Sequence, residues 1–71
     1  MGLPAQWTDP EHGVCLTLYA AIAHLKTQGI MAIPAKNTLH CVLTDQSERI
    51  IEPVYLPALG WVYPVTRLEG L

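Results

Sequence analysis

The sequence predicts a single small α+β domain, with one long N-terminal helix packed on an antiparallel β-meander of three strands, or four if a short strand precedes them. Three observations lead to this prediction. The chain has 71 residues, the length of one small domain. Residues 9–28 are mostly apolar and end at a glycine, as a helix does. Residues 31–68 alternate short apolar runs with turn residues, as a meander does.

The helix is predicted to follow an irregular lead-in of residues 1–8. Asp9 can accept hydrogen bonds from the first free backbone N–H groups of a helix, and Pro10 suits the first helical position. Gly29 can adopt the left-handed conformation that ends many helices. We therefore expect one helix over residues 9–28, about 28 Å long at the standard rise per residue.

Apolar side chains surround this predicted helix almost completely. Only Thr17, His24 and Gln28 form a thin polar stripe along it. A helix that is apolar nearly all round is buried on more than one side. In a chain this short, the second covering must come from the sheet or from another subunit.

Three runs are expected to form the strands of the meander. They are residues 38–44, 49–56 and 61–68. Residues 45–48 and 57–60 separate them and have the composition of turns. A short strand around residues 31–33 would make the sheet four-stranded. Both faces of this sheet are rather apolar, which again indicates a covering from outside the chain.

The composition points to self-association. The chain is 51% hydrophobic and 14% charged, whereas an average globular domain is about 25% charged. A small body has much surface and little interior, so some apolar side chains must lie at the surface. We expect a homo-oligomer, most simply a two-fold dimer, and a protein partner. The side chains expected at the interface are Leu18, Tyr19, Ile22, Tyr55, Trp61 and Tyr63.

Several other classes of protein do not fit the sequence. The net charge is −2 and the four basic residues are scattered, so no basic stripe would bind nucleic acid. The longest apolar stretch, residues 14–25, is shorter than the roughly 20 residues that span a membrane. Residues 1–6 lack the charge pattern of a signal peptide. We expect a cytoplasmic protein with reduced thiols at Cys15 and Cys41 and with no cofactor.

Cys15, His40 and Glu52 form one constellation that could carry chemistry. In the predicted fold Cys15 lies near the start of the helix, where the helix dipole lowers the pKa of a thiol. His40 would lie on one strand as the base, and Glu52 on the next strand would orient its imidazole. A four-residue turn that pairs Thr44 with Arg49 would point Glu52 away from His40, whereas an odd-length turn or a bulge would align them.

Several segments resemble the core of transglutaminase-like cysteine hydrolases and acyltransferases, which belong to the papain-like group. The segments are Gly13-Val14-Cys15, Gly29-Ile30, Pro34-Ala35-Lys36, His40 and Glu52-Pro53. The resemblance covers about residues 13–53 and implies Cys15 as nucleophile, His40 as base and Glu52 as orienting acid. The chain departs from the family in its short spacing between Lys36 and His40 and in having Glu where the family has Asp.

Simpler interpretations stand beside this one. Cys15 and Cys41 are of a type most often buried as small apolar side chains. His12 and Cys15 with His40 and Cys41 supply four zinc-ligand types, but neighbouring strand residues point to opposite faces, so we expect no metal site.

The leading hypothesis is a non-enzymatic binding or interaction module that acts as a homo-oligomer. The alternative is a miniature or degenerate transglutaminase-like enzyme that uses Cys15, His40 and Glu52. A third interpretation is a carrier for a small apolar ligand at the subunit interface, and no motif supports it.

Overall fold

The computed structural model describes residues 6–71, which form seven strands and two helices. The strands are β1 Gln6–Asp9, β2 Gly13–Leu16, β3 Met31–Ala35, β4 Thr38–Val42, β5 Glu48–Ile51, β6 Val54–Leu56 and β7 Gly60–Pro64; the helices are α1 Leu18–Lys26 and α2 Val65–Glu69. All strand pairs are antiparallel, and they form two sheets in the orders β1-β2-β7-β6 and β3-β4-β5. The chain is of the α+β class, but the predicted layout of one long helix on one meander is wrong.

The largest error is the helix predicted over residues 9–28, because residues 9–16 belong to a β-hairpin. Strands β1 and β2 pair with Trp7 opposite Cys15. The predicted lead-in of residues 1–8 is corrected as well, since β1 begins at Gln6; residues 1–5 lie outside the described residues.

The turn between β1 and β2 explains why the sequence suggested a helix start. The Asp9 carboxylate accepts hydrogen bonds from the backbone N–H groups of Glu11, at 3.1 Å, and His12, at 2.9 Å. A helix N-cap makes bonds of the same kind. Here they close a turn. Gly13, the first residue of β2 after this turn, has a φ of +76°.

Helix α1 begins after Thr17 and ends near the predicted position. Gly29 has a φ of +77°, and the next N–H group, of Ile30, donates to the Leu25 carbonyl at 3.0 Å. The predicted glycine stop is therefore confirmed. Within the helix only Ala21 and Leu25 are buried, so the shorter helix does not need a covering on every side.

The strands predicted around residues 31–33 and over residues 38–44 are present, whereas those predicted over residues 49–56 and 61–68 are corrected. Residues 38–44 contain β4, and the optional strand at residues 31–33 is β3. The strand predicted over residues 49–56 is interrupted at Glu52 and Pro53, so its halves β5 and β6 join different sheets. Proline has no N–H group to donate to a ladder, which explains the interruption.

The last predicted strand, over residues 61–68, becomes strand β7 followed by helix α2. Pro64 is the N-cap of this helix and has a φ of −61°, which leads directly into helical geometry. Leu68 on α2 is fully buried, so the turn of helix is held by the core.

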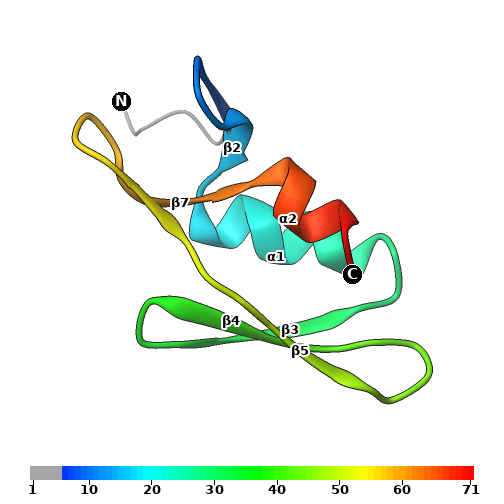
Figure 1. Cartoon of the computed structure of the whole chain (residues 1–71). Coiled ribbons are helices and arrows are strands. Elements are labelled where there is room, and N and C mark those ends of the chain that lie inside the picture. The colour runs from blue at the N-terminus through cyan, green and yellow to red at the C-terminus, as the bar shows by residue number, and fades with distance from the viewer. Residues whose placement is uncertain (1–5) are drawn as a thin grey trace.

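The core lies mainly between the two sheets, where both helices pack. Figure 1 shows α1 and α2 side by side above the sheet of β3, β4 and β5, and β2 and β7 lie on the other side of the helices. The main cluster comprises Leu16, Ala21, Leu25, Leu39, Cys41, Ile51, Tyr63 and Leu68. A smaller cluster of Cys15, Leu56 and Val62 lies within the four-stranded sheet.

Candidate functional site

The structure places the three predicted catalytic residues in different environments and does not bring them together. Cys15 lies on β2 of the four-stranded sheet and is buried in the smaller cluster. His40 lies on β4 of the other sheet, opposite Ile50, with an exposed side chain. Glu52 is exposed at the break between β5 and β6, and its backbone carbonyl accepts a hydrogen bond from Arg67 at 2.7 Å.

The register of the β4–β5 hairpin is that of the odd-length alternative, because the five residues 43–47 lie between the paired strands. Val42 pairs with Glu48 and His40 with Ile50, so a longer β5 would carry Glu52 on the same face as His40. Strand β5 ends at Ile51, however, and Glu52 falls beyond the paired region. The exposed face around His40 therefore presents isoleucine where the catalytic hypothesis needs an acid.

The surroundings of Cys15 do not activate its thiol. Burial raises the pKa of Cys15, and the Asp9 carboxylate acts in the same direction, against a smaller opposite effect of Arg67. Cys15 lies on β2 and not in the first turns of a helix, where the sequence analysis had placed it. Its thiol lies 3.6 Å from the Gly13 carbonyl, to which it donates a weak hydrogen bond. A buried, protonated thiol of this kind packs as an apolar side chain.

The β1–β2 turn holds a hydrogen-bonded pair of side chains that the sequence analysis did not single out. His12 Nδ1 lies 2.9 Å from Asp9 Oδ2. This hydrogen bond is the largest cause that lowers the pKa of Asp9, and the backbone N–H groups of His12 and Glu11 add to it. The Asp-Pro-Glu-His spacing is the local signal that could have revealed the pair. Both side chains stabilise the turn, and in residues 6–71 no three His, Cys, Asp or Glu side chains are grouped to hold a metal ion.

The predicted interface residues divide into exposed and buried sets. Tyr19 is 82% exposed, and Tyr55 and Trp61 form an edge-to-face pair with ring centroids 5.2 Å apart on the surface. Leu18 and Ile22 are half-buried against the main core.

Tyr63 belongs to the core and not to an accessible surface. Its side chain is 3% exposed, and its hydroxyl donates to the Asn37 carbonyl at 3.4 Å. The pattern of aromatic residues alone did not distinguish it from Trp61, two residues earlier on β7. Alternation along the strand does not distinguish them either, because residues two apart on a strand lie on the same face. Tyr63 lies opposite Leu16 of β2 and packs in the main core, whereas Trp61 lies opposite Tyr55 next to the β6–β7 turn.

Several exposed apolar side chains lie on the face of the three-stranded sheet that points away from the helices. We define the outer sheet face by six residues of β3, β4 and β5: Met31, Ile33, His40, Val42, Glu48 and Ile50. Met31 is 64% exposed, Ile33 53% and Ile50 62%. In Figure 1, no element of residues 6–71 covers this face. The sequence analysis noted that both sheet faces are apolar but did not place these residues at the interface.

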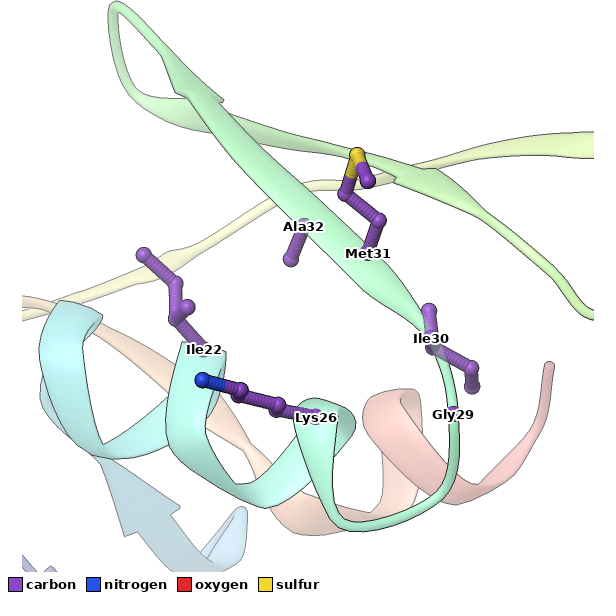
Figure 2. Close-up of a pocket in the computed structure, with 6 residues that line it drawn as sticks. All are labelled: Ile22, Lys26, Gly29, Ile30, Met31 and Ala32. Atoms are coloured by element: carbon purple, nitrogen blue, oxygen red, sulfur yellow. The ribbon is translucent and has the colours of Figure 1, made fainter.

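A shallow groove runs beside the sheet, between α1 and β3. It has a volume of about 370 Å³ and is lined by Ile22, Lys26, Gly29, Ile30, Met31 and Ala32. Figure 2 shows Ala32 pointing from β3 toward Ile22, whereas Met31 projects from the opposite side of the strand. The groove thus lies along the edge of β3, and Met31 belongs to both the groove and the outer sheet face.

Comparison with known proteins adds no relative: no protein-family model, no curated protein and no solved structure matches this chain. The resemblance to transglutaminase-like enzymes therefore stays a hypothesis that rests on the residues quoted for it. In residues 6–71, no helix has both the length and the apolar character needed to cross a membrane.

Proposed function

We propose that the protein is a non-enzymatic interaction module that acts as a homo-oligomer, most simply a two-fold dimer. The observation that carries the proposal is the set of large apolar side chains that the chain leaves in water. They are Trp7, Tyr19, Met31, Ile33, Ile50, Tyr55 and Trp61, each between 42% and 82% exposed. Apolar patches of this kind mark interaction surfaces in soluble proteins.

Two energetic effects favour the covering of such a surface. Burial of apolar surface stabilises a complex by about 25 cal/mol per Å². The exposed residues are also already held in place by strands and a helix. A rigid surface loses less side-chain and backbone entropy on binding than a loop does. A second copy is the partner always present at matching concentration, and two-fold dimers are the commonest oligomers.

The proposal includes a cytoplasmic location, because Cys15 and Cys41 are both free thiols buried in separate clusters. Free thiols without a disulfide fit a reducing compartment. A further protein partner would use the apolar residues that self-association leaves uncovered, such as the pair of Tyr55 and Trp61.

Sedimentation equilibrium of the wild-type chain tests the proposal. We expect a mass that rises from that of the 7.8 kDa chain toward twice this value across the micromolar range. A monomer mass at every concentration in this range contradicts the proposal. Buffers with and without added salt serve as a control, because an apolar interface is not weakened by screening of charges.

A further inference from the structure

We infer that the groove between α1 and β3 binds an extended peptide with an acidic and an apolar side chain two positions apart, and that this peptide adds a strand to the edge of β3. The inference goes beyond self-association and takes from the proposed function only the existence of a protein partner. Three features meet at this groove: a free strand edge, apolar walls and a lysine ammonium. Each feature fits a different part of such a peptide.

The free strand edge belongs to β3, with which only β4 pairs within residues 6–71. Only Lys36 and Asn37 lie between the paired residues Ala35 and Thr38, so this closing pair is of the hydrogen-bonded kind. Hydrogen-bonded pairs alternate along an antiparallel ladder, which directs the N–H and C=O groups of Ala32 away from β4. Ala32 also lines the groove, so a peptide there can form two hydrogen bonds with this residue.

The walls of the groove are apolar and come from both elements. Ala32 on β3 points toward Ile22 on α1, and Ile30 lies at the start of the strand (Figure 2). The volume of about 370 Å³ is at the low end for ligand sites. A site for a free small molecule encloses most of its ligand, whereas this groove is shallow. A shallow groove beside a strand edge fits an extended chain, which buries only alternate side chains.

The charge of the groove comes from Lys26. Its side chain extends from α1 back toward Ile22, one turn earlier (Figure 2). Within residues 6–71 no carboxylate forms an ion pair with its ammonium. Residues 13–44 contain Lys26 and Lys36 but no Asp or Glu, although the whole chain has a net charge of −2. The segment that holds α1, β3 and β4 is thus locally positive, and a carboxylate is the complementary group.

The period of a strand fixes the pattern of the peptide. The peptide residue opposite Ala32 points its side chain into the groove, and so do the residues two positions before and after it. An apolar residue and an acidic residue at this spacing can contact Ile22 and the Lys26 ammonium together. The residue between them points to the other side of the sheet, where Met31 and Ile33 are exposed.

A second copy of β3 fits this edge less well than a peptide does. Two β3 strands paired at Ala32 place Ile30 of one copy opposite Pro34 of the other. Pro34 has no N–H group, and the N–H group of Ile30 already donates to the Leu25 carbonyl at 3.0 Å. Neither residue can therefore donate across the new pair. The same pairing brings two Lys26 side chains to one side of the joined sheet, where like charges repel.

A titration followed by nuclear magnetic resonance tests the inference with a defined probe. The probe is the peptide Ser-Val-Thr-Glu-Thr-Val-Ser, acetylated and amidated so that glutamate carries its only charge. Its valines and glutamate share one face of a strand. We expect saturable binding with a dissociation constant below about 1 mM. The same peptide with glutamine in place of glutamate should bind about two- to fivefold more weakly.

A charge exchange identifies the cation that binds the probe. Lys26→Glu should reverse the preference, so that it binds a peptide with lysine in place of glutamate more tightly than the original. Arg49→Glu is the matched control, because it changes the charge equally on β5, at the other edge of the same sheet. It should keep the preference for the glutamate peptide. Far-ultraviolet circular dichroism checks that both variants keep the fold.

Hydrogen exchange of backbone amides tests the added strand separately. With free peptide at about ten times its dissociation constant, exchange of the Ala32 N–H should slow about tenfold. The control is the Ile50 N–H, which the alternation of the β4–β5 ladder directs to the other free edge of the sheet. Its exchange should stay unchanged.

The outcomes separate this inference from the proposed function. Absence of binding up to about 1 mM peptide, an unreversed preference in Lys26→Glu, or unchanged exchange at Ala32 overturns the inference and leaves the homo-oligomer standing. Slow exchange at Ala32 that depends on protein concentration alone would assign the edge to a second copy and also overturn it. A chain that is monomeric by sedimentation but binds the peptide as described overturns the homo-oligomer and supports the inference.

Discussion

Cys15 and Cys41 show how single residues in this protein serve the core. Each side chain is 1% exposed, and each belongs to a different apolar cluster. Burial raises the pKa of both thiols from the ordinary value of 9.0. The unfolded chain thus releases its two thiol protons at a lower pH than the folded protein does.

The raised pKa values predict a loss of stability in alkaline solution. The free energy of unfolding should be unaffected by the thiols below pH 9.0, the ordinary value, and should fall as the pH rises through the higher values of the folded state. Urea unfolding at about pH 8 and about pH 10 measures the difference. A variant with both cysteines replaced by alanine should show a smaller fall. Equal falls in the two proteins would contradict the assignment to the thiols.

Gly29 and Gly60 allow a matched test of backbone conformation. Their φ angles are +77° and +85°, but a Cβ on Gly29 would lie 3.3 Å from Thr44 Cγ2, whereas one on Gly60 meets nothing within 4 Å. We expect Gly60→Ala to destabilise the protein by about 1 kcal/mol through backbone strain. Gly29→Ala should cost more, about 2 kcal/mol, because contact with Thr44 adds to that strain. Urea unfolding measures both free-energy changes. Equal changes would contradict the expected effect of Thr44 and show that its side chain moves away from the added Cβ.

At the residue scale the sequence analysis was correct where a local rule decides the outcome. The stop at Gly29 and the burial of both cysteines are examples. It was wrong at Asp9, because the same carboxylate-to-backbone hydrogen bonds begin a helix or close a hairpin turn. The choice between them depends on the pairing of β1 with β2, which no local pattern of residues reveals.

Two prolines set the boundaries at the element scale. Pro53 lies in the interruption between β5 and β6, and Pro64 ends β7 and begins α2. The sequence analysis placed both prolines inside continuous strands, over residues 49–56 and 61–68. Whether a proline interrupts a strand or only marks its edge depends on the neighbouring strands. The assignment of β5 and β6 to different sheets is a property of long-range packing, and so the division into two sheets could not be read from the pattern.

Helix α2 has only five residues, so its stability must come from packing. Leu68 is fully buried between the sheets, whereas Arg67 is exposed and donates one hydrogen bond to the Glu52 carbonyl. We expect Leu68→Ala to lower the free energy of unfolding by about 3 kcal/mol. Arg67→Ala should lower it by about 1 kcal/mol or less. Chemical denaturation of both variants checks this, and similar effects would mean that α2 is held mainly by its polar contact.

At the scale of the whole molecule, the chain has more apolar surface than its core can bury. Within residues 6–71, two sheets share the main cluster and leave the outer sheet face uncovered. Composition alone indicated this excess, whereas its location required the registers of β3, β4 and β5. The predicted interface contained Tyr19, Tyr55 and Trp61 but not Ile33 or Ile50.

Self-association predicts that the stability of the molecule depends on its concentration. A dimer that forms only from folded chains adds stability by mass action. The melting temperature should therefore rise as the protein concentration increases through the dissociation constant. Differential scanning calorimetry at several concentrations measures this. A constant melting temperature for the wild type would mean that folding and association are not coupled.

The most direct measurement is a nuclear Overhauser experiment on a mixture of isotope-labelled and unlabelled chains, which reports contacts between copies only. Self-association through the exposed apolar side chains predicts signals that join side chains such as Ile33, Ile50 or Trp61 in one copy to side chains of the other. A sample that shows no intermolecular signal from any of the exposed apolar side chains would contradict this account.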